Sequence, residues 1–518
     1  MRYIDFFDRG AERYPGNILI HEPGRAWTYA DTKAWTHRIA NALMAAGLGP
    51  DSKVVTYGPN SAEGYAAQFG ILRAGCIWLP LNVRNSVYEN IEILQRMDAE
   101  WLFFHSSKID EAQQMREQMP ELKGLVCLDR ETPIAPALQD WAPLEGPDAT
   151  YFVKGALDTA VMLTTSGTTG RPKGVALPNL AWETMIASYM AVMPYDRPPV
   201  HIVAAPLTHA AGCLSGSLLP WGGTHVLLEK PDPLAILEAI HEHQATTVFA
   251  PPTLIYMMLA HPRVREFDYS SLRYFLYGAA PMSEQKLREA TEIFGPVMTQ
   301  TYGQTEVLMV VTFMSAAEHA EALTDPTKVG RLRSAGRAGP LAWVEIMDDE
   351  GNILGPDEPG EIVSRSNLRM TGYYKNPEAT EEASQWGWHH SGDVGVKDAD
   401  GYIYIVDRKK DLIISGGFNV YPSEVEQALW MHPSVQDCAV IGVADEKWGE
   451  RVTAAIELKP GAIFDEVELI AFCKERVGSV KAPKVIEAWE ALPRSPVGKV
   501  LKREIRDDFN SRAEQKQD

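Results

Sequence analysis

The chain has 518 residues, with 49 Lys and Arg against 69 Asp and Glu, so its formal net charge is −20. This charge argues against a nucleic-acid-binding protein, because such binding depends largely on Lys and Arg side chains at phosphates. Apolar residues make up 45% of the chain, which excludes an intrinsically disordered protein and provides for a large buried core.

The length predicts about two to four domains, at roughly 100–200 residues each. The five cysteines are scattered and form no Cys-x-x-Cys pair, so neither a disulfide framework nor a structural zinc site is expected. Reduced thiols of this kind are typical of a cytoplasmic protein. No run approaches the ~18 uninterrupted apolar residues of a membrane-spanning helix, and the first residues do not resemble a signal peptide.

Short apolar runs alternate with longer amphipathic runs between residues 53 and 303. Residues 53–59 and 77–82 are predicted strands, with a helix at 61–75 between them. Further strands are expected at 201–206, 224–229, 246–252, 274–278 and 297–303, and helices at 233–244 and 283–294. This alternation predicts an α/β fold, in which helices cover both faces of parallel sheets. In such folds, ligands bind at the carboxyl ends of the strands.

The pattern changes after Asp348, where Asp-Gly, Gly-Pro and Pro-Gly turns separate short alternating runs. Such turns predict hairpins of antiparallel sheet. The last ~110 residues mix helices with strands, at a size that suits one small α+β domain. We therefore expect two main domains, one spanning residues 1–408 and the other residues 409–518.

The strongest local motif is Thr-Thr-Ser-Gly-Thr-Thr-Gly-Arg-Pro-Lys-Gly at residues 164–174. Its glycines let backbone N–H groups approach an anion, its hydroxyls donate hydrogen bonds, and Lys173 adds a positive charge. These properties predict a loop that holds phosphate groups, although it lacks the Walker pattern and a flexible polar hairpin is the simpler alternative. The predicted phosphate contacts are Thr165, Ser166, Gly167, Thr168, Thr169 and Lys173.

With this loop, the chain resembles the adenylate-forming superfamily, which includes acyl-CoA synthetases and aryl-CoA ligases. Other motifs similar to those of that family follow in the expected order, at residues 278–281, 302–306, 391–393, 407–411, 415–419 and 493–499. The resemblance covers nearly the whole chain. It implies a large N-terminal domain of parallel-rich sheets with flanking helices and a distorted antiparallel barrel, followed by a small mobile α+β C-terminal domain.

The family joins a carboxylic acid to ATP, giving acyl-AMP and pyrophosphate, and a thiol then displaces AMP. Tyr302 offers an aromatic face on which adenine can stack, although a core tyrosine at a strand end is the alternative. The small residues at 278–280 allow the backbone to approach a flat base closely. The predicted nucleotide-binding residues in this part of the chain are Gly278, Ala279, Ala280, Gln300, Thr301 and Tyr302.

Glu306 is a carboxylate near the predicted phosphate site, so it can hold the Mg²⁺ that accompanies ATP, and Thr305 can donate its hydroxyl to a phosphate. A solvated or helix-start carboxylate is the alternative for Glu306. Asp393 can accept both hydroxyls of a ribose, and Arg408 can reach ribose or phosphate. Taken alone, these two residues also fit an Asx turn and a solvated charged loop.

Residues near the C-terminus take their predicted roles from the resemblance. It implies that Lys499 stabilises the charge that builds up during adenylation, whereas by itself it would be an ordinary surface lysine. Lys410 matches the family's hinge position, where a small number of residues absorb the change in backbone conformation. Gly416 and Gly417 would let the thin pantetheine arm of CoA pass close to the backbone.

The segment 206–212 matches the part of the family that enters the acyl pocket, so His209 is expected to line this pocket; a core histidine is the alternative. An amino-acid substrate would need a carboxylate to pair with its ammonium group, and residues 208–223 contain none. Small and apolar residues there predict a roomy apolar pocket. Fatty, aryl-alkanoic and cinnamic-type acids all stay candidates.

The sequence thus predicts an acid–CoA ligase that requires ATP and Mg²⁺ and uses coenzyme A as co-substrate. We expect a small carboxylic acid as substrate, no nucleic-acid partner, and a homodimer as one candidate assembly. An acyl-AMP ligase that loads a separate carrier protein is the nearest alternative. An inactive nucleotide-binding sensor is a further alternative, but the intact set of Lys173, Glu306, Asp393, Arg408 and Lys499 argues against it.

Overall fold

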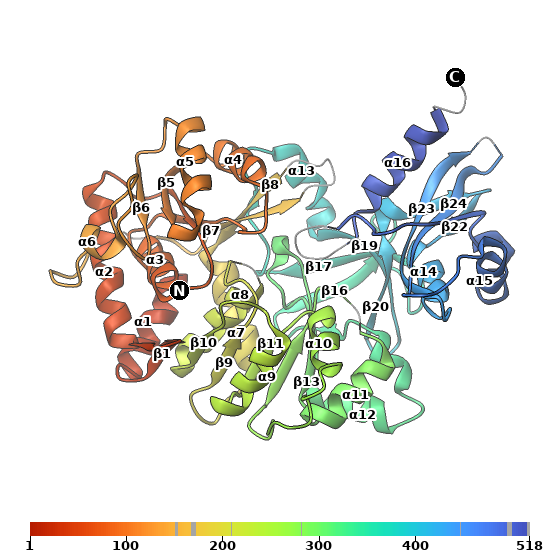
Figure 1. Ribbon diagram of the computed structural model, residues 1–518, viewed down its shortest axis with the longest axis horizontal. Coiled ribbons are helices and arrows are strands. Elements are labelled where there is room, and N and C mark those ends of the chain that lie inside the picture. Colours follow the sequence, from red (N-terminus) through yellow and green to blue (C-terminus); the bar gives the residue numbers. More distant parts are fainter. Residues whose placement is uncertain are drawn as a thin grey trace. The chain divides into compact units, whose positions relative to one another are not determined.

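A computed structural model describes residues 1–150, 154–166, 172–208, 210–280, 282–445, 447–494 and 500–514 of the chain (Figure 1). The chain divides into two compact units. The first comprises Met1–Val344, Val363–His390 and Asp400–Ile403, and the second comprises Glu345–Ile362, Ser391–Ala399 and Tyr404–Asp518.

A seven-stranded sheet in the first unit has the order β18-β8-β7-β4-β3-β5-β6. The strands from β7 to β6 are parallel, whereas β8 is antiparallel to both β7 and β18. In sheet order, the strands span Gly372–Tyr373, Pro172–Pro178, Thr159–Ser166, Ile77–Pro80, Lys53–Tyr57, Ala99–Phe104 and Gly124–Cys127.

A nine-stranded sheet in the same unit has the order β15-β14-β13-β12-β11-β9-β10-β1-β2. Its six central strands, β13 to β1, are parallel, and the edge strands β14, β15 and β2 are antiparallel to their neighbours. In sheet order, the strands span Arg337–Ala338, Thr312–Met314, Met298–Tyr302, Tyr274–Tyr277, Thr247–Phe249, Val200–Val203, Thr224–Leu227, Ile18–Glu22 and Arg25–Thr28.

The helices of the first unit alternate with these strands (Figure 1). Several begin at the hydroxyl caps that helix N-termini favour; Ser61, for example, accepts a hydrogen bond from the Gly64 amide at 3.1 Å. The helices α1 to α13 span Tyr3–Arg13, Tyr29–Ala45, Ala62–Arg73, Val87–Arg96, Ile109–Gln118, Leu138–Trp141, Asn179–Val192, Ala210–Leu218, Pro233–Glu242, Pro252–Leu259, Glu284–Phe294, Ala316–Thr324 and Pro377–Glu382.

The apolar core of the first unit is layered. Successive strand residues point to opposite faces, so Val203 faces a central cluster that α3, α7 and α8 share, whereas Ile202 faces a cluster formed with α9, α10 and α11. The seven-stranded sheet behaves in the same way, with Val54 in the central cluster and Val55 in an outer cluster with α4 and α5. Helices therefore cover both faces of parallel sheets, as the alternating pattern predicts.

The second unit contains a five-stranded sheet of order β22-β21-β24-β23, with β25 paired to β24. Strands β21 to β25 span Ile413–Ser415, Phe418–Val420, Val435–Asp445, Gly449–Leu458 and Val485–Ala488, and helices α14 to α16 span Pro422–Trp430, Glu466–Lys481 and Lys502–Glu514. A four-stranded sheet of order β16-β17-β19-β20 has strands at Ala342–Met347, Gly360–Ser366, His389–Lys397 and Ile403–Arg408.

The predicted fold class is confirmed, with mixed sheets and an antiparallel subdomain in the large N-terminal part and a small C-terminal domain. The boundary at residue 408 stays a prediction. No helix in the described part of the chain is long and apolar enough to cross a membrane.

Two buried histidines lie side by side on neighbouring strands. His201 of β9 and His225 of β10 are paired in register, their ring centroids are 5.8 Å apart, and neither is exposed to solvent. Within the described residues, both ring nitrogens of His225 lack a hydrogen-bond partner. Burial lowers the pKa of His225 to about 3, so this histidine is neutral in the folded protein.

We expect this neutral histidine to make the protein sensitive to acid. The unfolded state binds more protons wherever the pH lies between the folded pKa of about 3 and the ordinary value near 6.5, so stability falls as the pH drops below about 6.5. Between pH 7 and pH 5, replacing His225 by Phe should reduce the loss of unfolding free energy by about 2 kcal/mol, as measured by urea unfolding. Identical losses in the variant and the wild type would contradict this assignment.

Candidate active site

The predicted phosphate loop, residues 164–174, begins within β7 and ends within β8, and these two strands pair in antiparallel register. Thr165 and Lys173 face each other in the antiparallel register, and both are half-buried. The predicted contacts Gly167, Thr168 and Thr169 lie outside the described residues, and only the backbone of Ser166 is described.

A glycine is required at position 174, within β8. A Cβ at Gly174 would lie 2.1 Å from the sulfur of Met97, closer than any side chain allows. The close packing of Gly174 therefore fixes the base of the loop and the strand position of Lys173.

Three side chains connect this hairpin to the predicted magnesium ligand. The Lys173 ammonium lies 4.8 Å from the ring centroid of Tyr373, a distance typical of a cation–π contact. The Tyr373 hydroxyl donates a hydrogen bond to Oε1 of Glu306 at 2.9 Å. Burial, with the negative charge of Glu306 as a further cause, raises the pKa of Tyr373, so the hydroxyl keeps the proton that it donates.

Tyr373 is a residue that the sequence analysis missed. It lies on β18, which pairs with β8 so that Tyr373 is opposite Val175 and only two register positions from Lys173. No local spacing relates it to Glu306, which precedes it by 67 residues. The short Gly372–Tyr373 strand could have been expected from Gly-Tyr-Tyr after a turn, but its partner strand could not.

The predicted adenine site lies at the carboxyl ends of β12 and β13, which are neighbours in the nine-stranded sheet. A Cβ at Gly278 would come within 2.8 Å of the Thr301 carbonyl oxygen, so the two strand ends approach as only glycine permits. Ala279 has a φ of +68°, a strained conformation of the kind found at functional sites. Ala279 and Ala280 are exposed, and Tyr302 is half-buried beside them.

The side chains of two other residues predicted for this site form hydrogen bonds with other groups of the protein. The Gln300 side chain is buried and accepts a hydrogen bond from the Tyr277 hydroxyl at 3.1 Å. The Thr301 hydroxyl donates to the Met309 carbonyl oxygen at 2.7 Å. These contacts shape the strand end that carries Tyr302, and a contact of either side chain with nucleotide stays a prediction.

Glu306 fits a magnesium ion brought by ATP. It lies with Thr305 in the 3₁₀ turn Thr305–Val307 after β13, and its carbonyl oxygen accepts a hydrogen bond from the Met370 amide at 2.7 Å. Tyr373 bonds Oε1, which leaves Oε2 as a candidate metal ligand. The described residues contain no cluster of three or more metal-binding side chains. A single carboxylate suits Mg²⁺, which is usually held by one or two carboxylates together with substrate phosphates.

The second unit brings together the two residues predicted for ribose. The Arg408 guanidinium Nε lies 2.7 Å from Oδ1 of Asp393, and the Asp393 side chain is only 4% exposed. The Asp393 amide donates to the Ser391 hydroxyl at 3.1 Å, which holds the turn before it. An ion pair in this position pre-orients both the acceptor and the donor that a nucleotide would contact.

Gly416 and Gly417 form the two-residue turn between β21 and β22, with φ values of +59° and +82°. Such a turn requires a positive φ at both positions, which favours glycine. A Cβ at Gly416 would lie 3.1 Å from the Trp448 ring, whereas a Cβ at Gly417 would meet no atom within 4 Å. Lys410 is exposed, and Lys499 lies outside the described residues.

The predicted acyl segment leads into helix α8. His209 lies outside the described residues, and α8 begins at the next residue, Ala210. A Cβ at Gly212 would be 1.8 Å from the Leu207 carbonyl oxygen, so only glycine allows the helix to start this close to the preceding loop. Cys213 and Leu214 are buried in the central apolar cluster.

Comparison with known proteins assigns the family. Residues 7–374 match the model of the AMP-binding enzyme family, and residues 424–499 match its AMP-binding enzyme C-terminal domain. The chain belongs to the AMP-binding enzyme family. This confirms the resemblance to adenylate-forming enzymes and identifies the protein as an AMP-forming acid–thiol ligase of the acyl-CoA synthetase family.

Relatives of this AMP-binding enzyme differ in what they join. A feruloyl-CoA synthase of an Amycolatopsis species is 37% identical over 97% of this chain and 98% of its own. A fatty acid–[acyl-carrier-protein] ligase of Streptomyces coeruleorubidus, ScoC, is 32% identical over 96% and 95%. The structure of the amide bond synthetase McbA from Marinactinospora thermotolerans superimposes with a TM-score of 0.88, at 30% identity over 98% of this chain and 100% of the other.

We expect Tyr373→Phe to weaken the enzyme's use of magnesium. The variant keeps the ring beneath Lys173 but leaves the Glu306 carboxylate without its hydroxyl partner, and partners of this kind typically change metal affinity or activity about 10–100-fold. The half-saturating Mg²⁺ concentration for ATP–pyrophosphate exchange should rise about tenfold.

Tyr374→Phe is the matched control for this experiment. Its hydroxyl also donates to a carboxylate, Oδ2 of Asp98 at 2.6 Å, but not to Glu306. The control should keep the wild-type dependence on Mg²⁺. An equal rise of the half-saturating Mg²⁺ concentration in both variants would show that the hydrogen bond from Tyr373 to Glu306 does not affect metal binding.

Proposed function

We propose that the protein is a carboxylic acid–CoA ligase that first adenylates an apolar fatty or aryl acid and then transfers the acyl group to the thiol of CoA. The observation that supports this proposal is the Lys173–Tyr373–Glu306 arrangement, in which one tyrosine contacts both the Lys173 ammonium and the Glu306 carboxylate. Family membership supplies the reaction type.

In the first half-reaction, an oxygen of the substrate carboxylate attacks the α-phosphorus of ATP, and the bond to pyrophosphate breaks. Lys173 and the hairpin bind the phosphates, and Tyr302 stacks on the adenine. When bound at Glu306, Mg²⁺ neutralises phosphate charge. Lys499 stabilises the negative charge that grows between the attacking carboxylate and the phosphate.

In the second half-reaction, the thiolate of CoA attacks the acyl carbon and AMP leaves with its phosphate oxygen. Asp393 and Arg408 hold the ribose of the nucleotide through this step. The turn at Gly416 and Gly417 gives the pantetheine arm a path beside the backbone, and the open space around the Gly417 Cβ position supports this assignment.

The segment around α8 supports an apolar acid as the substrate. Residues 208–223 contain no carboxylate to pair with an amino group, and the described part of α8 is buried among apolar side chains. Relatives named for ferulate and for fatty acids support both an aryl and an aliphatic acid.

A separate carrier protein is the alternative acceptor of the acyl group. A separate carrier protein would receive the acyl group through its own pantetheine thiol, by the same chemistry as CoA. The similarity to a fatty acid–[acyl-carrier-protein] ligase supports this alternative.

The decisive test is product analysis with wild-type protein. The protein is incubated with ATP, Mg²⁺ and a panel of fatty, aryl and amino acids, with and without CoA, and products are identified by mass spectrometry. We expect acyl-AMP without CoA and acyl-CoA with it, from an apolar acid. Accumulation of acyl-AMP despite CoA would favour the carrier protein, and the absence of both products with every acid would contradict the proposal.

Gly417→Leu should separate the two half-reactions. We expect ATP–pyrophosphate exchange to stay within about twofold, while thioester formation from supplied acyl-AMP falls about 100-fold, because a side chain would obstruct the pantetheine path. Gly461→Leu is the control for backbone strain, since Gly461 has nearly the same φ, +83°, and equally open surroundings. If Gly461→Leu slowed thioester formation to the same extent, or if Gly417→Leu also abolished adenylation, backbone strain alone would explain the loss.

A further inference from the structure

A chain of buried side chains connects helix α12 to the predicted adenine site. Nε2 of His319, a residue of α12, is 2.8 Å from the Tyr277 hydroxyl, and the same hydroxyl is 3.1 Å from the side-chain amide of Gln300. Tyr277 is the last residue of β12, directly before Gly278, and it is paired in register with Gln300 of β13. The chain therefore ends at the two strand ends where adenine is predicted to bind.

The Tyr277 hydroxyl has one proton but two close neighbours. It can donate this proton to Nε2 of His319 or to the amide oxygen of Gln300, but not to both. The neighbour that does not receive the proton must itself donate to the Tyr277 oxygen. The position of the proton on the imidazole ring of His319 therefore decides which of the two bonds Tyr277 donates.

The other ring nitrogen of His319 has only an acceptor beside it. Nδ1 lies 2.9 Å from the Ser315 carbonyl oxygen, which also accepts the His319 backbone amide at 3.0 Å. Because a carbonyl oxygen cannot donate, this contact assigns a proton to Nδ1. Burial lowers the pKa of His319 to about 4, although the Ser315 bond and the Glu318 charge oppose this change, so the ring is neutral at neutral pH. Nε2 then carries no proton and accepts the proton of Tyr277.

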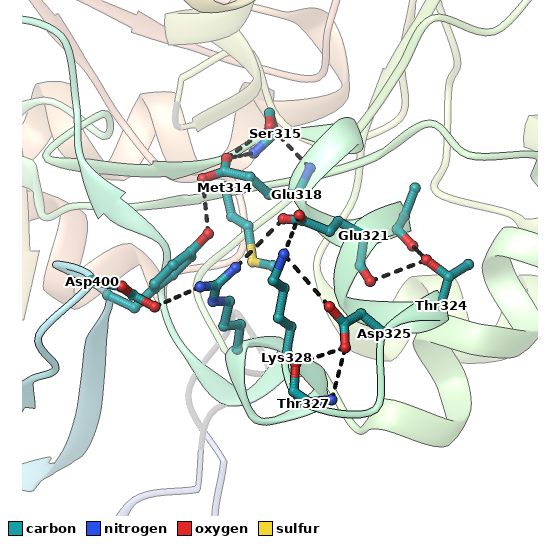
Figure 2. Close-up of polar contacts among 12 residues, drawn as sticks. Met314, Ser315, Glu318, Glu321, Thr324, Asp325, Thr327, Lys328 and Asp400 are labelled. Carbon is teal, nitrogen blue, oxygen red and sulfur yellow. Dashed lines mark hydrogen bonds and ion pairs between the residues drawn. The ribbon is translucent and has the colours of Figure 1, made fainter.

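The start of α12 holds the Ser315 carbonyl in place. The amide and hydroxyl of Ser315 both donate to Oε2 of Glu318, at 2.8 and 2.7 Å, in the capping box that Figure 2 shows. Oε1 of Glu318 accepts from Arg337 at 2.6 Å and from the Tyr402 hydroxyl at 3.1 Å. The Tyr402 ring is itself held between the guanidinium groups of Arg331 and Arg337, whose carbons lie 4.8 and 5.2 Å from its centroid. Ser315 is therefore a fixed acceptor for Nδ1.

This proton arrangement determines the direction of the Gln300 amide. The oxygen and nitrogen ends of an amide have nearly the same shape, so the neighbouring donors and acceptors decide which end lies where. With the Tyr277 proton on His319, the Tyr277 oxygen can only accept from Gln300, across the 3.1 Å between the two side chains. The NH₂ group of Gln300 is then turned towards Tyr277. The opposite bond, from Tyr277 to the Gln300 oxygen, would require a charged His319.

The carbonyl oxygen of Gln300 is then left for the nucleotide. Gln300 and Tyr302 are two positions apart on β13, so their side chains lie on the same face of the strand. Within the described residues, the end of the amide away from Tyr277 has no hydrogen-bond partner and is not fully buried. Adenine carries an amino group at C6, which donates, whereas guanine carries an oxygen there, which accepts. A fixed carbonyl oxygen would bond to the first and repel the second.

We propose that His319 and Tyr277 are positioning residues that select adenine over guanine, because they keep the Gln300 carbonyl oxygen directed at the base. This inference rests on the proposed function, which places the adenine of ATP against Tyr302. Ser315 sets the tautomer of His319, His319 accepts the Tyr277 proton, and Tyr277 sets the direction of the amide. Base selection thus depends on side chains that do not touch the nucleotide.

A neutron crystal structure of the wild-type protein at neutral pH tests the proton arrangement without nucleotide. We expect a deuteron on Nδ1 of His319, none on Nε2, and the Gln300 nitrogen towards Tyr277. A deuteron on Nε2, or the Gln300 oxygen towards Tyr277, would overturn the proposal.

Nucleotide affinity tests the consequence, with Kd values of ATP and GTP measured by isothermal titration calorimetry in the presence of Mg²⁺. His319→Leu removes the acceptor, so Tyr277 donates to Gln300 and the NH₂ group turns towards the base. The preference for ATP over GTP should fall about 30-fold, through weaker ATP binding and tighter GTP binding. Tyr277→Phe leaves the amide free to take either direction, so the preference should fall only about fivefold.

His319→Gln and Tyr269→Phe are the matched controls. The amide oxygen of the first variant can accept the Tyr277 proton in place of Nε2, so its preference for ATP should stay within about threefold of the wild type. Tyr269 is a buried tyrosine of the same apolar cluster as Tyr277, but its hydroxyl donates to the Val264 carbonyl oxygen at 2.6 Å. Tyr269→Phe should leave the preference unchanged.

A merely structural role would weaken the binding of ATP and GTP equally and would not distinguish the two His319 variants. Either that result or an unchanged preference in His319→Leu would overturn the proposal. These outcomes are distinct from failure of the proposed function, in which the wild type forms no acyl-AMP with any acid. Neither experiment needs an acid, so both test the roles of His319 and Tyr277 in that case as well.

Discussion

The hydrogen bond from Tyr373 to Glu306 is the contact on which the candidate site depends. Tyr373 belongs to β18 at the edge of the seven-stranded sheet, whereas Glu306 follows β13 of the nine-stranded sheet. The bond between the Met370 amide and the Glu306 carbonyl oxygen lies at the same junction. Each sheet supplies half of the proposed phosphate- and metal-binding site, and the junction between the sheets brings the halves together.

This arrangement explains why small residues are concentrated around the site. Gly174, Gly278 and Gly212 each stand where a Cβ would collide with a neighbour, at the base of the phosphate hairpin, at the adjoining strand ends and at the start of α8. Because all three close approaches lie next to predicted ligand contacts, substitution at any of them would displace a functional segment rather than only weaken the core. The same three glycines therefore determine both the close packing of these segments and the positions of the predicted ligand contacts.

The parallel sheets, their helices and the family could be predicted from the sequence, because the alternation of apolar runs is strong and the motifs are long. Helix α3, at Ala62–Arg73, lies within the predicted range 61–75. Tyr373 could not be predicted, since its role depends on which distant strand β18 pairs with. The same limit applies to Tyr402, whose ring is held by arginines about 65–71 residues earlier in the chain. Local patterns identify elements, but they do not specify non-local side-chain contacts.

We propose that one site, built around Lys173, Tyr373 and Glu306, binds the ATP that activates the acid. A crystal structure with ATP and Mg²⁺ tests it most directly. We expect phosphates beside Lys173, the metal on Glu306 Oε2, the Tyr373 hydroxyl still on Oε1, and adenine against Tyr302. Nucleotide bound away from Lys173 and Glu306, or a metal held by other residues, would contradict it.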